Sequence, residues 1–323
     1  MSTKKIGIIG AGAISTTLHL PLLSCLPNVS IEYIADIESP IELAKVYKTK
    51  SIKIDDISTI PDCDLVLLAT PVGAREKYVQ EFSKRKTPMF TEKPFAVDLE
   101  THKRFLDLSD KISCNYMKIH YNSTRQIKNI IASGAFGNLK KVSITEGGIV
   151  GKTNRGKDTY QANHNLSGGG IIIESACHTL SQLASIFSDI SVREANVIWE
   201  GDFDVEAKTV FDVSGKNHFD VDYTITMIKP VETGATFFFE NSKISFNHTI
   251  PNSELFVSGY DTDECFTLNK ETKYASTANQ AYYLKWKSFL DKITNGDIID
   301  TKFETSIKTT ELITDIYKKG SKK

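Results

Sequence analysis

Short apolar runs alternate with longer, more polar stretches over the first third of the chain. Residues 63–70 (CDLVLLAT) are almost continuously apolar, as expected of a strand covered on both faces of a parallel sheet. Residues 75–86 (REKYVQEFSKRK) instead have the composition and spacing of a helix. Further strands are predicted over residues 4–9, 29–36, 87–93 and 112–119. Strands that alternate with helices in this way indicate right-handed βαβ units in a doubly wound parallel sheet.

The pattern changes after about Tyr121. A helix is expected to stop at Gly134, and from Val192 to Tyr274 most of the chain is predicted as strands separated by turn residues. Consecutive strands joined by short turns are typical of a largely antiparallel sheet. Two further helices, which start near Asn279 and Thr305, are predicted at the end of the chain.

The length of 323 residues exceeds what one hydrophobic core usually supports, so two domains are expected. We predict an α/β domain of the dinucleotide-binding (Rossmann) type over residues 1–120, built on the doubly wound sheet. We predict an α+β domain over residues 121–323, with a large, open, mostly antiparallel sheet.

Composition and charge narrow the class of partner. The formal net charge is −1, which gives no attraction toward nucleic acid or an anionic membrane and favours a small-molecule partner. The five cysteines are scattered and form no C-x-x-C pair, which indicates free thiols in a reducing compartment and no metal site. No apolar run approaches the ~18 residues of a membrane helix. We therefore expect a cytoplasmic protein.

A glycine-rich turn lies within residues 6–15 (IGIIGAGAIS). Gly10, Gly12 and Ser15 stand where the pattern G-x-G-x-x-G places its glycines, between a predicted strand and a predicted helix. In that pattern the first glycine permits the turn, and the second lets a pyrophosphate approach the backbone and the helix N-terminus. A plain strand–turn–helix without a ligand is the alternative.

Asp36 ends the second predicted strand and strengthens the dinucleotide interpretation. A carboxylate at this position can accept hydrogen bonds from the hydroxyls of an adenosine ribose, and it repels a 2′-phosphate. No arginine follows in the next residues (DIESP), so NAD is favoured over NADP as the cofactor. The alternative role of Asp36 is that of a turn-forming aspartate at the end of a strand.

Residues 91–95 (TEKPF) follow another predicted strand and are expected at the carboxyl edge of the sheet, where ligands bind in open α/β folds. Lys93 could donate a hydrogen bond to a substrate oxygen there, although most lysines in such tripeptides are simply solvated. Further along, Glu174 and His178 are spaced to share one face of a helix. An imidazole can take up a hydroxyl proton as hydride leaves the same carbon. An ordinary surface pair of Glu and His is the alternative.

Nearly the whole chain resembles the Gfo/Idh/MocA oxidoreductases. The resemblance rests on GIIGAGAIS, HLPLL, LLATPVG, TEKPFAVDLE, IIASGAFGNLKKV, SGGGIIIESACHTL and FLDKITNG. It implies that Lys93 is the active-site lysine, that Thr70 and Pro71 line the cofactor site, and that the Lys93–Pro94 bond is cis. It also implies that the sheet of the second domain joins subunits into a homodimer or homotetramer.

The predicted sites follow from these patterns and this resemblance. The cofactor site comprises Gly10, Gly12, Ala13, Ile14, Asp36, Thr70, Pro71, Glu92 and Lys93. The catalytic groups are Lys93, His178 and Glu174, and the substrate contacts are Lys118, Asn163, His164 and Arg155. Arg155 lies with Lys152 and Lys157 in a basic loop, which favours an anionic substrate if the loop covers the site; a solvated loop is the alternative.

The chain departs from the family pattern at three places. Glu174 replaces the usual aspartate, Arg75 stands where a histidine is common, and the basic position after the fifth strand survives as Lys118 followed by Ile119. These changes bear on which substrate the protein binds more than on the hydride-transfer chemistry.

The predicted function is hydride transfer between NAD and a secondary alcohol or ketone of a sugar, cyclitol or nucleotide sugar. Two alternatives are an NAD-dependent glycosidase that oxidises its substrate transiently, and a non-catalytic protein that senses NAD or a sugar.

Overall fold

The computed structural model describes residues 3–149, 159–215, 218–260, 265–268, 274–296 and 305–320. The chain divides into two compact units. Unit 1 comprises residues 1–116 and 282–307, and unit 2 comprises residues 117–281 and 308–323. This division differs from the expected one at 1–120 and 121–323, because a segment from near the end of the chain belongs to unit 1.

Unit 1 contains a six-stranded sheet in the order β3-β2-β1-β4-β5-β6. All of its strand pairs are parallel. The strands are β1 (Lys4–Ile9), β2 (Val29–Asp36), β3 (Lys50–Lys53), β4 (Leu65–Leu68), β5 (Met89–Thr91) and β6 (Ile112–Cys114). The order reverses direction between β1 and β4, so the predicted doubly wound parallel sheet is confirmed.

Helical segments connect these strands. They are a π-helical turn (Ser15–His19) that continues into α1 (Leu20–Ser24), α2 (Ile41–Val46), α3 (Glu76–Lys84) and α4 (Leu99–Leu108). Pro21 does not interrupt the first of these helices, because it lies in the first turn of α1, where proline is tolerated. Helix α4 begins where the Asp98 side chain accepts a hydrogen bond from the backbone N–H of Thr101.

The core of unit 1 explains why the late segment belongs to it. Helix α8 (Ala278–Asn295) contributes Trp286 and Phe289 to a cluster with apolar residues of β1, β4 and β5. Trp286 is fully buried and stacks on Phe90 at 4.2 Å between ring centroids. Burial of each side chain of this size stabilises the folded state by about 2–3 kcal/mol. Part of α8 therefore completes the core of a unit whose other residues lie far earlier in the sequence.

Unit 2 contains an eight-stranded sheet in the order β14-β13-β12-β11-β7-β10-β9-β8. Its strands are β7 (Leu139–Gly147), β8 (Ile190–Glu200), β9 (Phe203–Val213), β10 (Phe219–Thr226), β11 (Gly234–Phe239), β12 (Lys243–Phe246), β13 (Phe256–Ser258) and β14 (Cys265–Thr267). Only the β7–β10 pair is parallel, and the others are antiparallel. The predicted mostly antiparallel sheet is confirmed, with β7 inserted between strands that come later in the chain.

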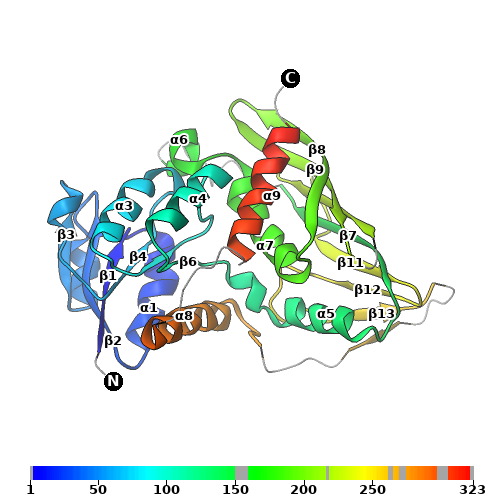
Figure 1. Ribbon diagram of the computed structural model, residues 1–323, viewed down its shortest axis with the longest axis horizontal. Coiled ribbons are helices and arrows are strands. Elements are labelled where there is room, and N and C mark those ends of the chain that lie inside the picture. Colours follow the sequence, from blue (N-terminus) through cyan, green and yellow to red (C-terminus); the bar gives the residue numbers. More distant parts are fainter. Residues whose placement is uncertain are drawn as a thin grey trace. The chain divides into compact units, whose positions relative to one another are not determined.

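Helices cover one face of this sheet. Figure 1 shows α5 (Asn122–Ser133) and α7 (Cys177–Ile186) along it, and unit 2 also contains the short helix α6 (His164–Ser167) and most of α9 (Thr305–Lys319). The expected stop of α5 at Gly134 is confirmed, since Gly134 adopts a left-handed conformation with φ of 66°. Phe237 and Phe239 are buried, so this face takes up much of the aromatic density of β11.

Three predicted strands are too long. Strand β4 covers Leu65–Leu68 against the predicted 63–70, and β5 covers Met89–Thr91 against the predicted 87–93. Strand β6 ends at Cys114, and residues 117–120 form a 3₁₀ turn (Met117–His120) rather than more strand. In the part of the chain that the structure describes, no helix combines the length and apolar character needed to span a membrane.

Candidate functional site

Predicted cofactor residues meet at the carboxyl edge of the unit 1 sheet. Gly10 directly follows β1, Asp36 ends β2, Thr70 follows β4 by two residues, and Lys93 follows β5 by two residues. The strand order reverses between β1 and β4, and α/β folds bind ligands at such switch points. The fold therefore brings these four predicted residues to one edge.

The two glycines of the turn have different surroundings. Gly10 has a φ of +100°, and a Cβ there would lie 2.6 Å from the carbonyl oxygen of Ala69. A Cβ at Gly12 would meet nothing within 4 Å, and Gly12 is exposed. Ser15 takes the third position, fully buried, and its hydroxyl donates to the carbonyl of Gly10 at 2.6 Å. Gly10 is therefore required by the fold, whereas the open backbone at Gly12 leaves room for a ligand.

Asp36 connects the end of β2 to the turn. Its Oδ2 accepts a hydrogen bond from the backbone N–H of Ala11 at 2.6 Å, and its Oδ1 accepts one from that of Ile37 at 2.7 Å. The side chain is half-buried. A carboxylate offers about four lone-pair sites, so two remain for hydroxyl donors. The turn-forming role and the ribose-binding role are therefore compatible.

Thr70 and Arg75 shape the loop after β4. The Thr70 hydroxyl oxygen is buried and has no hydrogen-bond partner among the described residues. The side chain of Arg75 is almost fully buried and donates to the carbonyl of Thr70 at 3.0 Å, to that of Phe95 at 3.0 Å, and to that of Pro94. One guanidinium thus holds the loop after β4 against the loop that carries Lys93. In the sequence Arg75 stands out only as a departure from the family pattern, because a lone arginine gives no signal that it will be buried against carbonyls.

Lys93 lies in a turn whose preceding residue, Glu92, contacts buried side chains of unit 1. The Lys93–Pro94 peptide bond is cis, as the resemblance implies, and Lys93 is half-buried. Glu92 is buried, and its carboxylate contacts His19 and Asn115 in the interior of the unit. Glu92 was predicted in the cofactor site, and its side chain instead contacts these interior groups.

In unit 2, Glu174 and His178 lie at the start of one helix. Glu174 falls in a π-helical turn (Ile172–Ala176) that continues into α7, which carries His178 one turn later. Both side chains are half-buried. Single π turns are frequent at functional sites. Lys93 belongs to unit 1 and this pair to unit 2.

Asp204 of β9 holds the N-terminus of this helix. Its Oδ1 accepts hydrogen bonds from the backbone N–H of Gly170 at 2.6 Å and from the hydroxyl of Tyr317 at 2.9 Å. Its Oδ2 accepts one from the N–H of Ile172 at 2.7 Å. A carboxylate at this end of a helix satisfies N–H groups that have no partner within the helix.

The triple glycine before the helix has a packing explanation. Gly168 ends α6 with a φ of 77°. A Cβ at Gly169 would lie 2.3 Å from the Tyr317 hydroxyl, and one at Gly170 would lie 2.1 Å from the carbonyl oxygen of Asp204. The glycines therefore let the backbone approach β9 and α9 closely, which fixes where the helix with His178 begins.

Lys118, a predicted substrate residue, has a charged neighbour in the core of unit 2. It lies in the 3₁₀ turn that packs against α7, and it interacts electrostatically with the buried carboxylate of Glu146. Burial raises the pKa of Glu146, but hydrogen bonds from His248 and Tyr223 together with the charge of Lys118 keep it below the ordinary value. The unit 2 core thus places a negative charge beneath Lys118.

The other predicted substrate residues are spread out. Asn163 and His164 are exposed and line an open hollow of about 390 Å³ with Asn165, Trp199 and Asp202. The Asn163 side chain also accepts a hydrogen bond from the N–H of Asn165 and so caps α6. Arg155, with the rest of its basic loop, lies outside the described residues.

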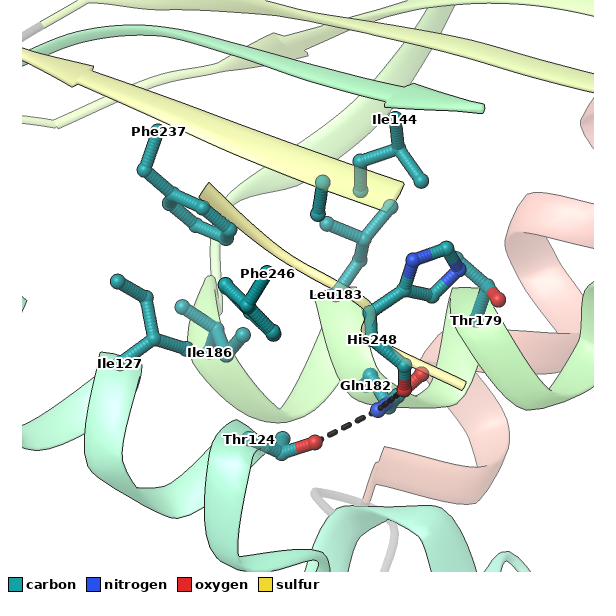
Figure 2. A pocket seen from close by; sticks show the side chains of 11 residues that line it. Thr124, Ile127, Ile144, Thr179, Gln182, Leu183, Ile186, Phe237, Phe246 and His248 are labelled. Atoms are coloured by element: carbon teal, nitrogen blue, oxygen red, sulfur yellow. Dashed lines mark hydrogen bonds between the residues drawn. The ribbon is translucent and has the colours of Figure 1, made fainter. Parts of the chain in front are cut away.

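A second cavity lies under α7 and is too small for a substrate. Figure 2 shows Gln182 donating to the Thr124 hydroxyl and to the His248 carbonyl at its rim, with apolar side chains such as Ile144 and Phe237 around it. Its volume is about 20 Å³, against roughly 300–1,000 Å³ for ligand pockets. It is a packing void of the unit 2 core.

Two histidines outside the predicted site are buried next to glutamates. His19 contacts Glu92 at 2.7 Å in unit 1, and His248 contacts Glu146 at 3.2 Å in unit 2. The described residues contain no group of three or more His, Cys, Asp or Glu side chains arranged to hold a metal ion.

Comparisons with known proteins agree with the fold and the cofactor edge. Residues 4–120 match the family GFO_IDH_MocA, described as an oxidoreductase family with an NAD-binding Rossmann fold. An inositol 2-dehydrogenase/D-chiro-inositol 3-dehydrogenase of Lacticaseibacillus casei is 29% identical over 41% of this chain and 41% of its own length. The curated relatives are matched over 41–57% of their length.

Two solved structures share the fold over 98% of this chain. One is KijD10, a 3-ketoreductase from Actinomadura kijaniata in complex with NADP and TDP-benzene, at a TM-score of 0.83, 14% identity and 98% of that chain. The other is a levoglucosan dehydrogenase in complex with NADH, at a TM-score of 0.83, 16% identity and 97% of that chain. The family match places residues 4–120 with the Gfo/Idh/MocA oxidoreductases, and the solved structures show that the rest of the chain shares their fold.

Proposed function

We propose that the protein is an NAD-dependent oxidoreductase that transfers a hydride between nicotinamide and a secondary alcohol or ketone of a sugar, cyclitol or nucleotide sugar. The observation that carries this proposal is the carboxyl edge of the unit 1 sheet, where the open backbone at Gly12, the carboxylate of Asp36 and the turn of Lys93 occur together.

The residues at this edge fit a dinucleotide. The backbone from Gly12 to Ile14 opens a helix and is uncovered at Gly12, which suits a pyrophosphate. Asp36 retains acceptor capacity for a ribose diol, and the buried Thr70 hydroxyl would gain a partner from a bound ligand. When bound, nicotinamide supplies the site that accepts or donates the hydride.

The chain's own groups would handle the substrate oxygen and its proton. Lys93 donates a hydrogen bond to the reacting oxygen and stabilises negative charge on it. His178 accepts the hydroxyl proton during oxidation and returns it during reduction, and Glu174 orients the ring or contacts a second hydroxyl. Lys118 contacts the substrate as a positive charge, with Asn163, His164 and Arg155 as further contacts.

Variants of these three groups test the division of roles. Lys93→Met removes the charge at similar length, and we expect turnover to fall about 10²–10⁴-fold with little change in NADH affinity. His178→Asn should also slow turnover and remove a titration near neutral pH from the kcat profile. Glu174→Gln should be milder, because it keeps the shape and some hydrogen bonding. Near-full turnover of Lys93→Met on the true substrate would exclude Lys93 as the catalytic lysine.

The substrate class is supported by the names of similar proteins, which are an inositol dehydrogenase, a levoglucosan dehydrogenase and a 3-ketoreductase. Solved structures of this fold hold either NADP or NADH. Asp36 supports NAD for this chain, because its carboxylate can accept hydrogen bonds from a ribose diol and repels a 2′-phosphate. Fluorescence titration of both reduced cofactors tests it. Tighter binding of NADH is expected, and equal or tighter binding of NADPH would overturn the assignment.

A further inference from the structure

A chain of buried hydrogen bonds leads from α8 to the turn of Lys93, entirely within unit 1. The Trp286 indole Nε1 lies 2.9 Å from His19 Nδ1, and His19 Nε2 lies 2.7 Å from Glu92 Oε1. Trp286 and His19 are fully buried, and Glu92 is 6% exposed. The three residues come from α8, the first helix and the end of β5, so the fold, rather than local sequence, brings them together.

The chemistry of the donors fixes the protonation of His19. An indole N–H can only donate, so Nδ1 of His19 must be the acceptor and carries no proton. The ring proton of a neutral imidazole then lies on Nε2, which donates to the Glu92 carboxylate. A doubly protonated ring would place two donors 2.9 Å apart, so His19 is neutral in this arrangement.

The Glu92 carboxylate connects His19 to the backbone of Lys93 through hydrogen bonds. Its Oε1 also accepts from the Asn115 amide at 2.7 Å, and its Oε2 accepts from the backbone N–H of Lys93 at 3.0 Å. Burial raises the pKa of the Glu92 carboxyl, whereas the hydrogen bonds from His19 and Asn115 and nearby positive charge, including that of Lys93, lower it below the ordinary value. Glu92 is therefore ionised at neutral pH, and its two oxygens accept three hydrogen bonds.

We propose that His19 is a positioning residue for Lys93: oriented by Trp286, it holds the Glu92 carboxylate that fixes the main chain at the start of the Lys93–Pro94 turn. The link to catalysis rests on the proposed role of Lys93, whereas the hydrogen-bond chain itself does not. Arg75 holds the other end of this turn through the carbonyls of Pro94 and Phe95.

The other ionisable groups around Glu92 do not replace His19. Cys114 donates through Sγ to the Glu92 carbonyl at 3.7 Å, and burial raises the pKa of its thiol to about 12, so it stays neutral. Lys93 contributes its positive charge to the carboxylate of Glu92, while Lys285 and Arg75 act on Cys114. His19 is the histidine that donates directly to this carboxylate.

Three variants separate positioning from folding. His19→Gln keeps one amide donor and one acceptor, His19→Leu removes both, and Trp286→Phe removes only the indole donor while keeping an aromatic ring on Phe90. His248→Leu is the matched control, because it breaks the other buried pair of histidine and glutamate, in unit 2.

The first readout needs no substrate. In the wild type, ¹⁵N NMR of His19 should show an unprotonated Nδ1 and a protonated Nε2. In Trp286→Phe, which lacks the indole donor, His19 should no longer show this one tautomer alone. The carboxyl pKa of Glu92, followed by ¹³C NMR, should rise in His19→Leu, return toward the wild-type value in His19→Gln, and stay unchanged in His248→Leu. An unchanged Glu92 titration in both His19→Leu and Trp286→Phe would overturn the proposal.

The second readout is kinetic. Misplacement of a catalytic group by about 1 Å can cost about 10²-fold in rate, so His19→Leu should lower kcat about 10–100-fold and change NADH affinity by no more than about 2-fold. His19→Gln should recover most of kcat, and equal loss in both variants would contradict a positioning role. If no NAD(H) binding or turnover occurs while the NMR pattern holds, the proposed function fails and the positioning of Lys93 by His19 stands.

Discussion

Gly10 and Gly12 lie two residues apart and have opposite requirements. Gly10 adopts a positive φ and contacts the backbone after β4, whereas Gly12 has neither constraint. A Cβ at Gly12 would cost the ligand-free protein nothing sterically, yet it would occupy the space proposed for a pyrophosphate.

The first prediction compares alanine at these two positions. Gly12→Ala should change the free energy of unfolding by no more than about 1 kcal/mol and weaken NADH binding at least about tenfold. Gly10→Ala should destabilise unit 1 by about 1–3 kcal/mol, because it combines a strained φ with a close backbone contact. Urea unfolding and fluorescence titration measure both quantities. NADH affinity at wild-type level in a folded Gly12→Ala protein would contradict a phosphate site at this turn.

The second prediction concerns acid stability and His102. Burial lowers the pKa of His102 from about 6.5 to about 3, and the ring packs on Phe95 at 4.1 Å. Because the unfolded chain binds this proton more readily, the folded state loses stability as pH falls below about 6.5, by up to about 1.4 kcal/mol per pH unit, until about pH 3. Urea unfolding at pH 7, 6 and 5 should show this slope, and His102→Leu should flatten it. Equal slopes for both proteins would exclude His102 as the cause.

Single residues differ in how far sequence could reveal them. Gly10, Gly12, Asp36 and Lys93 were predictable because they lie at strand ends or within three residues after them, and strand ends meet at one edge of a parallel sheet. Arg75, His19 and Asp204 act through buried contacts with residues distant in sequence, such as Asp204 with Tyr317. No local pattern carries that information.

At the scale of elements, the helix that carries Glu174 and His178 is fixed by its N-terminus. The third prediction is that Asp204→Asn destabilises unit 2 by about 1–3 kcal/mol, because an amide nitrogen cannot accept one of the three hydrogen bonds. Tyr317→Phe is the matched control, since it removes only one of these bonds and should cost about 1 kcal/mol. Thermal unfolding compares the two. Equal stability of Asp204→Asn and the wild type would show that this cap is dispensable.

The first and last residues of a strand were predictable where the apolar and polar pattern is regular. They were less predictable where contacts with residues distant in sequence decide where the strand ends. Strands β1 and β2 match their predicted bounds. Strand β6 was predicted too long because Asn115 and Tyr116 are buried after the chain leaves the sheet, and their hydrogen bonds to Glu92 and Phe95 replace strand pairing. The assignment of α8 to unit 1 was missed, because an amphipathic pattern does not say which core receives it.

At the scale of the whole molecule, the fourth prediction is a homodimer or homotetramer joined through the sheet of unit 2. Val210 and Phe238 lie half-buried on the side of this sheet opposite the buried residues, beside the ion pair of Lys141 and Asp222. Light scattering at micromolar concentration should give a multiple of 36.0 kDa, and Val210→Glu should lower it. A monomeric mass for the wild type would exclude this assembly.

The most direct test of the central claim is to account for NADH and product together. The protein is incubated with NAD and a panel of sugars, cyclitols and nucleotide sugars, with NADH followed by absorbance and products by mass spectrometry. We expect NADH in a 1:1 ratio with a product two mass units lighter, and a loss of about 10²–10⁴-fold in rate for Lys93→Met. A cleaved glycoside without accumulated NADH, or no turnover on any substrate, would contradict it.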